Sequence, residues 1–152
     1  GDVSLVVGDL AMPNGIAFSP DEKTLYVADT ERHFVFAYNV LKDGSVSDGR
    51  LFASAPAPNR WVGPDGMAVD IKGNLYVATP DGVRIYDPKG KEIGLVPTEK
   101  GATNCAFGGP DGATLYITAQ DSLYSAAMKY PGALYARRFS EKVEGERMKD
   151  EE

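Results

Sequence analysis

The stretch Leu75-Tyr76-Val77-Ala78 decides the fold of this chain, because close copies of it occur before and after it. One copy is Leu25-Tyr26-Val27-Ala28, which begins 50 residues earlier, and the other is Leu115-Tyr116-Ile117-Thr118, which begins 40 residues later. Each copy is a short run of apolar and aromatic residues of the kind that forms a buried strand. A repeat of this length indicates a fold built from similar successive units.

A shorter apolar run and a tight-turn sequence precede each copy. The runs occupy residues 16–18, 67–69 and 105–107, and the turns contain Pro20-Asp21, Gly73-Asn74 and Asp111-Gly112. Two apolar runs separated by a turn rich in Gly, Asp and Asn predict a β-hairpin. Each unit is therefore expected to open with two antiparallel strands.

Two further strand-like stretches follow each copy. The third stretch of each unit covers residues 34–40, 83–86 and 123–127, and the weaker fourth covers residues 50–53, 92–96 and 134–139. Four short strands in every 40 to 50 residues, roughly, are typical of one blade of a β-propeller. The alternative is a β-sandwich, whose strands need no common register from one unit to the next.

We therefore predict an all-β chain that forms about three four-stranded blades of a β-propeller, at residues 14–53, 65–96 and 104–139. Residues 3–10 are expected to be the outer strand of a preceding blade, so that residues 1–139 make a partial propeller. Residues 140–152 form a tail in which nine of thirteen residues are charged. Such a tail has too little apolar surface to pack, and we expect it to be disordered or a short helix.

Composition limits the classes of function. The net charge is -6 and no Lys/Arg cluster is interleaved with aromatic residues, which argues against nucleic acid and against a membrane surface as partners. Cys105 is the single cysteine, so no intramolecular disulfide is expected. No apolar run approaches the roughly 18 residues of a membrane span, and we expect a soluble protein, cytoplasmic rather than periplasmic. Because the first residue is Gly1 and not Met, we expect the natural start to lie upstream.

Three polar residues share one position in the aligned units. Asn14, Asp65 and Asn104 each stand just before the innermost strand, so they are expected at the mouth of the central channel. Their amide and carboxylate oxygens are ligands that a hard cation such as calcium prefers. The alternative is that Asn14 and Asp65 are turn residues, since each precedes a glycine and Pro-Asp-Gly recurs at residues 80–82 and 110–112. Each of those two Pro-Asp-Gly sequences, however, falls between two strands of the same blade.

Four motifs occur in a fixed order around these residues: Met-Pro-Asn-Gly-Ile-Ala-Phe-Ser-Pro-Asp at 12–21, Gly-Pro-Asp-Gly-Met-Ala-Val-Asp at 63–70, Gly-Asn-Leu-Tyr-Val-Ala at 73–78 and Thr-Asn-Cys-Ala-Phe-Gly-Gly at 103–109. Over roughly residues 3–128, the chain resembles the senescence marker protein, gluconolactonase and luciferin-regenerating enzyme family. The resemblance implies a six-bladed propeller, of which this chain is the C-terminal half. It also implies hydrolysis of a sugar lactone with one divalent cation in the central channel.

The resemblance assigns roles to individual residues. Asn14 matches a metal ligand, Asp65 matches an aspartate that binds the metal and acts as base, and Asn104 matches a position that lines the channel. Calcium is the expected cation, with zinc or manganese as alternatives. It would polarise the lactone carbonyl and lower the pKa of a bound water. A glutamate from the first blade and an asparagine or arginine from the second have no counterpart here, so the chain is expected to hold part of the site.

Other candidate side chains lie in predicted loops. Four of them could contact sugar hydroxyls at the channel mouth, or could be plain surface residues: Arg32, Asn59, Arg60 and Trp61. His33 is the single histidine and has no nucleophile motif nearby, so we expect an exposed loop residue. Cys105 has apolar neighbours and is expected to be a small buried side chain and not a reactive thiolate.

Two functions are compatible with the sequence. The first is a metal-dependent sugar-lactone hydrolase of the gluconolactonase type. The second is a non-catalytic β-propeller that binds a ligand or a protein, because residues 64–87 alone fit the repeats of such scaffolds nearly as well. The open edges of three blades further predict a partner that completes the propeller, which is either a second chain or a missing N-terminal half.

Overall fold

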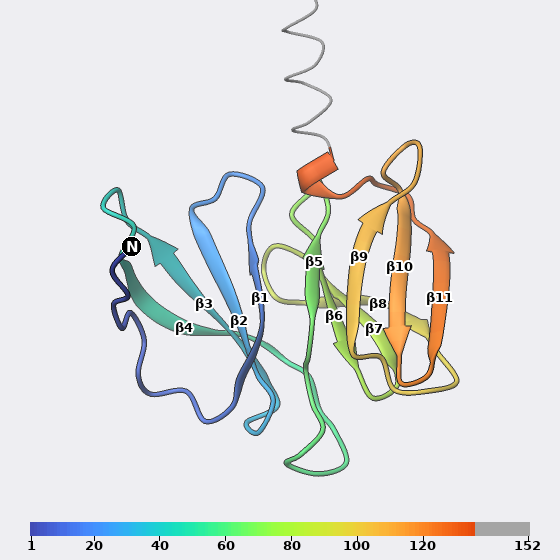
Figure 1. Cartoon of the computed structure of the whole chain (residues 1–152), viewed down its shortest axis with the longest axis horizontal. Helices are drawn as coiled ribbons and strands as arrows, with labels where there is room; N and C mark the ends of the chain where they lie inside the picture. Colours follow the sequence, from blue (N-terminus) through green and yellow to red (C-terminus); the bar gives the residue numbers. More distant parts are fainter. Residues whose placement is uncertain (136–152) are drawn as a thin grey trace, which may run out of the picture.

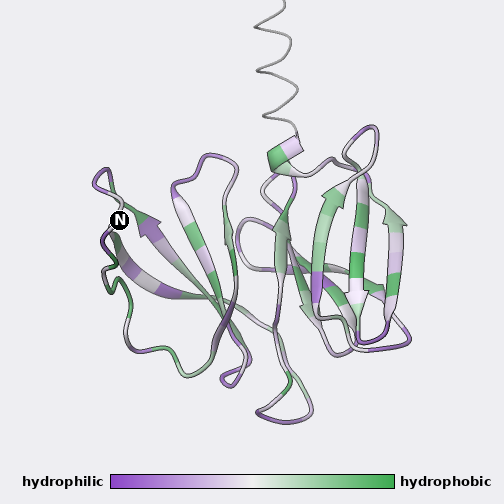
Figure 2. Ribbon diagram, viewed as in Figure 1, coloured by the Kyte–Doolittle hydropathy of each residue, from purple (hydrophilic) through white to green (hydrophobic). Residues whose placement is uncertain are grey.

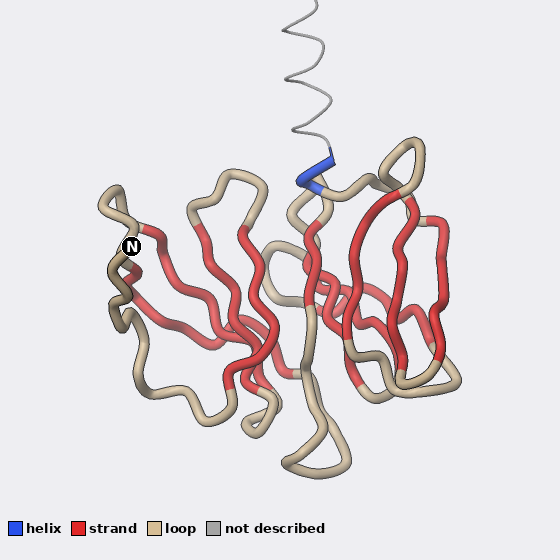
Figure 3. The backbone as a smooth tube through the Cα atoms, in the orientation of Figure 1, coloured by secondary structure: helices blue, strands red, loops and turns tan. Residues whose placement is uncertain are grey.

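The computed structural model describes residues 1–135, and these form almost only β-strands, turns and loops (Figure 3). Three antiparallel sheets follow one another along the chain, which confirms the all-β prediction. The first sheet contains β1 (Pro13–Phe18), β2 (Thr24–Asp29), β3 (Phe34–Val40) and β4 (Val46–Ser54), in that order. The second contains β5 (Met67–Val69), β6 (Leu75–Thr79), β7 (Gly82–Tyr86) and β8 (Glu92–Pro97), again in chain order.

The third sheet has three strands within the described residues. They are β9 (Asn104–Gly108), β10 (Thr114–Ala119) and β11 (Ser122–Ala127), with β10 in the centre. The predicted fourth strand at residues 134–139 is wrong for its described part, because residues 133–135 form a helical turn. After β11 the chain returns to the second sheet, where Gly132 forms an isolated bridge with Asp70. Residues 136–139 of that strand and the predicted tail at 140–152 lie outside the described residues.

The first strands of the three sheets lie side by side. β5 lies between β1 and β9, and each sheet extends outward from its first strand (Figure 1). This arrangement is the one expected for successive propeller blades, in which the first strands line a common axis. The residues that begin β1, β5 and β9 consequently meet at one end of the molecule, the lower end in Figure 1.

Two layers of apolar side chains hold the sheets together. Between the first and second sheets, Tyr26 and Val35 pack with Leu75 and Val77, and Leu75 is completely buried. Between the second and third sheets the packed residues are Tyr76, Ala78, Val83, Cys105, Leu115 and Ile117. The repeated strands thus supply the core, while many connecting loops are hydrophilic (Figure 2). Burying a leucine of this kind contributes roughly 1.5–3 kcal/mol.

Aspartates fix the hairpin turns of the sheets. The buried Asp70 carboxylate accepts hydrogen bonds from the backbone amides of Lys72 and Asn74 at 2.8 and 3.0 Å, and from the Tyr76 hydroxyl at 3.2 Å. Asp111 accepts one from the amide of Ala113 at 3.0 Å. Asp111, in one of the recurring Pro-Asp-Gly motifs, is therefore a turn residue within its sheet, as the sequence predicted.

Residues 3–10 form no strand, so the predicted outer strand of a preceding blade is wrong for this structure. A strand needs a hydrogen-bonded neighbour, and the inner strands of a preceding blade are not among the described residues. Val7 and Leu10 instead pack on Leu25, Val27 and Tyr38 at the open face of the first sheet. Among residues 1–135 no helix is long and apolar enough to cross a membrane.

Candidate functional site

The three predicted residues begin the three inner strands. Asn14 is the second residue of β1, Asn104 is the first of β9, and Asp65 stands two residues before β5. Backbone hydrogen bonds hold the segment before β5 against its neighbours. The amide of Asp65 donates to the carbonyl oxygen of Ala78 at 2.9 Å, and the amide of Gly66 donates to the carbonyl oxygen of Thr103 at 3.0 Å. The structure thus places all three side chains at the same end of adjacent strands.

Two glycines allow the three segments to touch. A Cβ atom at Gly15 would overlap the carbonyl oxygen of Asp65 and lie 2.9 Å from its carbonyl carbon. A Cβ atom at Gly66 would overlap Oδ1 of Asn104 and lie 2.8 Å from its Cα. The glycines that follow Asn14 and Asp65 are therefore required by close approach between sheets and not by a hairpin turn.

A buried hydroxyl connects the candidate residues of the first two sheets. Oγ1 of Thr30 donates to the carbonyl oxygen of Pro64 at 2.9 Å and accepts from Nδ2 of Asn14 at 3.3 Å. Because its proton is committed to Pro64, the hydroxyl can only accept from Asn14, which turns the amide nitrogen toward Thr30. The amide oxygen of Asn14 is left for another partner. Sequence reasoning missed Thr30, since the equivalent residues Pro80 and Gln120 carry no hydroxyl and no repeat pattern marks it.

The Asp65 carboxyl has a perturbed acidity. Burial raises its pKa above the ordinary value for aspartate, while hydrogen bonds from the Gly66 backbone and the Asn14 side chain lower it, with a net rise. A half-buried carboxyl with a raised pKa is a better proton acceptor than a surface aspartate. On the third sheet, Oδ1 of Asn104 accepts a hydrogen bond from the backbone amide of Cys105 at 2.8 Å.

The donors at this end fit a hard cation. Asn14, Asp65 and Asn104 offer one carboxylate and two amide oxygens, the chemistry that calcium prefers. Calcium takes about six to eight oxygens, so these three side chains would be a partial shell. Among residues 1–135 no three His, Cys, Asp or Glu side chains are grouped to hold a metal. Two of the three candidates here are asparagines, which do not count toward such a group.

The predicted loop residues lie around the first sheet. Arg32 forms an ion pair with the buried Asp29 at 3.4 Å and lines a hollow with the N-terminal segment. Arg60 pairs with Glu31, and its guanidinium lies 4.9 Å from the ring centroid of Trp61. The roles of Arg32 and Arg60 in contacting substrate stay predictions.

His33 and Cys105 have structural partners. Nε2 of His33 lies 2.8 Å from the carbonyl oxygen of Asn59, and the residue, with a φ of 58°, forms part of the β2–β3 turn. The prediction of an exposed residue is wrong, because His33 is half-buried. Burial raises the pKa of the Cys105 thiol to about 12. Cys105 is therefore protonated at neutral pH, as expected for a core residue.

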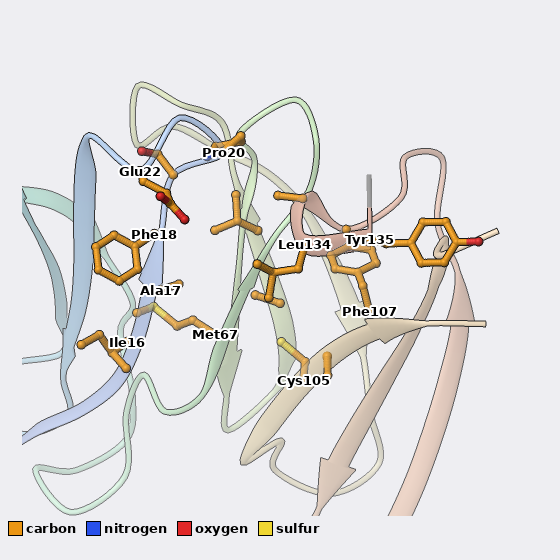
Figure 4. Close-up of a pocket in the computed structure, with 16 residues that line it drawn as sticks. Ile16, Ala17, Phe18, Pro20, Glu22, Met67, Cys105, Phe107, Leu134 and Tyr135 are labelled. Atoms are coloured by element: carbon orange, nitrogen blue, oxygen red, sulfur yellow. The ribbon is translucent and has the colours of Figure 1, made fainter. Parts of the chain in front are cut away.

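An apolar hollow of about 350 Å³ lies along the inner strands, beyond the polar residues. Phe18, Met67 and Leu134 are among the side chains around it (Figure 4). The helical turn at residues 133–135 borders this hollow at the end away from Asp65, and Ala133 packs against the core of the first two sheets. The polar residues thus lie at the starts of the inner strands, and the apolar hollow lies further along the same strands.

Three successive antiparallel sheets whose first strands lie side by side define a protein of the β-propeller class. The profile of the SMP-30/gluconolactonase/LRE-like region matches residues 1–121. The chain therefore belongs to the SMP-30, gluconolactonase and luciferin-regenerating enzyme family, as the sequence motifs predicted.

Named relatives agree with this assignment. A gluconolactonase of Zymomonas mobilis is 34% identical over 137 residues, which cover 85% of this chain and 38% of that protein. Pentonolactonase XacC of Haloferax volcanii is 39% identical over 123 residues, covering 78% and 41%. The chain thus spans about two fifths of the length of these relatives.

Solved structures show the same fold. A gluconolactonase from Xanthomonas campestris matches with a TM-score of 0.69 and 38% identity over 82% of this chain and 39% of its own. A calcium-binding protein, regucalcin from Agrobacterium tumefaciens, matches with a TM-score of 0.75 over 87% of this chain and 51% of its own, at 24% identity. The predictions of this family and of its propeller fold are confirmed.

Proposed function

We propose that this chain is part of a sugar-lactone hydrolase that acts with one bound divalent cation. The observation that carries the proposal is the half-buried carboxyl of Asp65 between Asn14 and Asn104 at the starts of three inner strands. Relatives that share this stretch are a gluconolactonase and a pentonolactonase, which supports a sugar lactone as substrate. Sugar lactones are small and polar, and oxygen donors at a channel mouth suit such a ligand.

The side-chain oxygens of Asn14, Asp65 and Asn104 would hold the cation, and calcium suits them best because all three are hard donors. When bound, a divalent cation polarises a lactone carbonyl and makes a water molecule more acidic. Asp65 accepts the proton of the attacking water, a role for which its raised pKa prepares it. Thr30 holds the Asn14 amide in one orientation throughout. Zinc and manganese remain alternatives, since amide and carboxylate oxygens accept several divalent ions.

The test measures hydrolysis of glucono- and pentonolactones in a pH-stat, with calcium and with a chelator, by a full-length propeller that contains this chain, because Asn14, Asp65 and Asn104 alone make a partial shell. We expect turnover that needs the cation and is lost in Asp65→Asn. Asp111→Asn is the matched control, because Asp111 stands in the same Pro-Asp-Gly sequence but caps a turn. Equal turnover in the Asp65 and Asp111 variants would refute the assignment of Asp65. Calcium binding that depends on Asp65 but supports no turnover would favour the non-catalytic binding propeller.

A further inference from the structure

The loop that connects the first two sheets, residues 56–62, leads directly into Asp65. It belongs to no strand and lies between two complete four-stranded sheets. It extends past the starts of β1 and β5, at the lower end of Figure 1. The connecting loop therefore stands at the same end of the molecule as the candidate site.

Both ends of the connecting loop are held by the β2–β3 turn. The amide of Ala55 donates to the carbonyl oxygen of His33 at 2.8 Å, and Nε2 of His33 lies 2.8 Å from the carbonyl oxygen of Asn59. A Cβ atom at Gly63 would overlap the carbonyl oxygen of Thr30 and lie 3.1 Å from Cδ2 of His33. The loop therefore begins and ends against one turn, as compact surface loops with close ends do.

Thr30 joins this loop to the candidate site. Its hydroxyl donates to the carbonyl oxygen of Pro64, which follows the loop, and accepts from the side chain of Asn14. Trp61 stands four residues before Asp65, so their Cα atoms are at most about 14 Å apart, the length of four residues of extended chain. The indole of Trp61 and the carboxyl of Asp65 can therefore border one ligand.

The tip of the loop has a defined conformation. The amide of Trp61 donates to Oδ1 of Asn59 at 2.9 Å, and the amide of Val62 donates to the carbonyl oxygen of Asn59 at 3.3 Å. Arg60 forms an ion pair with Glu31, and its guanidinium lies over the ring of Trp61 at 4.9 Å from the centroid. A cation over an exposed aromatic ring contributes roughly 0.5–1 kcal/mol. These contacts hold the indole in one orientation.

Trp61 is nevertheless exposed. It is 68% accessible and packs in none of the apolar clusters of the described residues. A tryptophan that contributes nothing to these clusters, yet is held by its neighbours, offers a rigid surface to a ligand. The indole combines a large apolar face with one N–H donor, and a sugar ring is likewise apolar on its faces and polar at its rim.

We propose that Trp61 contacts the substrate and binds the ring of the sugar lactone, while Asp65 acts at the lactone carbonyl. The C–H groups on the faces of a sugar ring pack against the electron-rich face of an aromatic ring. Hydrolysis opens the lactone ring, and the open-chain acid has no such face. Trp61 therefore favours substrate over product and aids release of the product. The inference takes its ligand class from the proposed function.

The first experiment measures binding without turnover. A full-length propeller that contains this chain is labelled with 5-fluorotryptophan, and the ¹⁹F resonance of Trp61 is identified by its loss in Trp61→Phe. Methyl β-D-glucopyranoside, which keeps its ring and has no lactone carbonyl, is expected to shift this resonance saturably. Open-chain sorbitol is expected to bind at least about fivefold more weakly, because it lacks a ring face. No shift with the glucoside, or an equal response to sorbitol, would overturn the proposal.

The second experiment measures hydrolysis of gluconolactone by the same full-length protein. Trp61→Ala is expected to raise KM at least about fivefold with little change in kcat, and Trp61→Phe should recover part of the loss because it restores an aromatic face. Leu41→Ala is the control, since Leu41 is 45% exposed at the opposite end of β3 from His33. An unchanged KM in Trp61→Ala, or an equal rise in Leu41→Ala, would reject the role of Trp61.

The two experiments separate this inference from the proposed function. A saturable shift of the Trp61 resonance in a protein that hydrolyses no lactone would refute the proposed function and leave a sugar-binding surface at Trp61. Hydrolysis that needs Asp65 but is indifferent to Trp61 would refute the inference alone.

Discussion

The hydroxyl of Thr30 offers the sharpest test of how the candidate site is held together. Thr30→Val keeps the shape of the side chain and removes the donor to the buried carbonyl of Pro64 and the acceptor for Asn14. Leaving a buried hydrogen-bonding group without its partner costs about 1–3 kcal/mol. For a chain of this size, about 2 kcal/mol corresponds to a fall in Tm of roughly 4–8 °C.

The assay is thermal unfolding followed by circular dichroism, with Thr30→Ser as the conservative variant. Serine restores the hydroxyl, so its Tm should lie closer to that of the unchanged chain than to that of Thr30→Val. Calcium titration by calorimetry gives a second readout, because a freely rotating Asn14 amide should weaken binding. Equal Tm values for Thr30→Val and the unchanged chain would refute the role assigned to this hydroxyl.

Three further predictions concern the same end of the molecule and the core. Asp65→Asn should raise Tm at neutral pH, because burial raises the pKa of Asp65 and its ionised form therefore destabilises the fold. This gain in Tm should vanish as the pH falls through the pKa of Asp65, which thermal melts at a series of pH values would measure. Gly66→Ala should destabilise the fold by about 1–3 kcal/mol in urea unfolding through collision with Asn104, whereas Gly94→Ala, with no atom nearer than 3.6 Å, should not. Leu75→Ala should cost about 2–5 kcal/mol by the same measurement, since Leu75 is fully buried, and unchanged stability would contradict the core described above.

The repeated strands made most of the fold predictable. Residues of the Leu-Tyr-Val-Ala type are apolar on both faces, and such strands lie in the centre of sheets that are covered on both sides, as β6 is. Hairpin turns followed from Asp and Gly, whose preferences are local. The two errors, at residues 3–10 and at the described residues 134–135, concern predicted outer strands, whose formation depends on a neighbour and not on their own sequence.

The site was predictable as far as it repeats. Asn14, Asp65 and Asn104 share one position of the unit, so alignment was enough to bring them together. Thr30 does not repeat, and its role arises from contact between two sheets across 34 residues of sequence. The half-burial of His33 likewise depends on the carbonyl of Asn59, in a loop that propensity does not specify.

Because the candidate residues start the inner strands, the segments that would touch a substrate are separate in sequence from those that maintain the fold. Residues 56–62 and 98–101 connect the sheets beside these residues and belong to no strand. Changes of length or sequence there would leave every pairing between strands intact. Such a chain can acquire new substrate preferences through its connections at little cost in stability, and a directed-evolution library confined to these two segments should retain an unusually large fraction of folded variants.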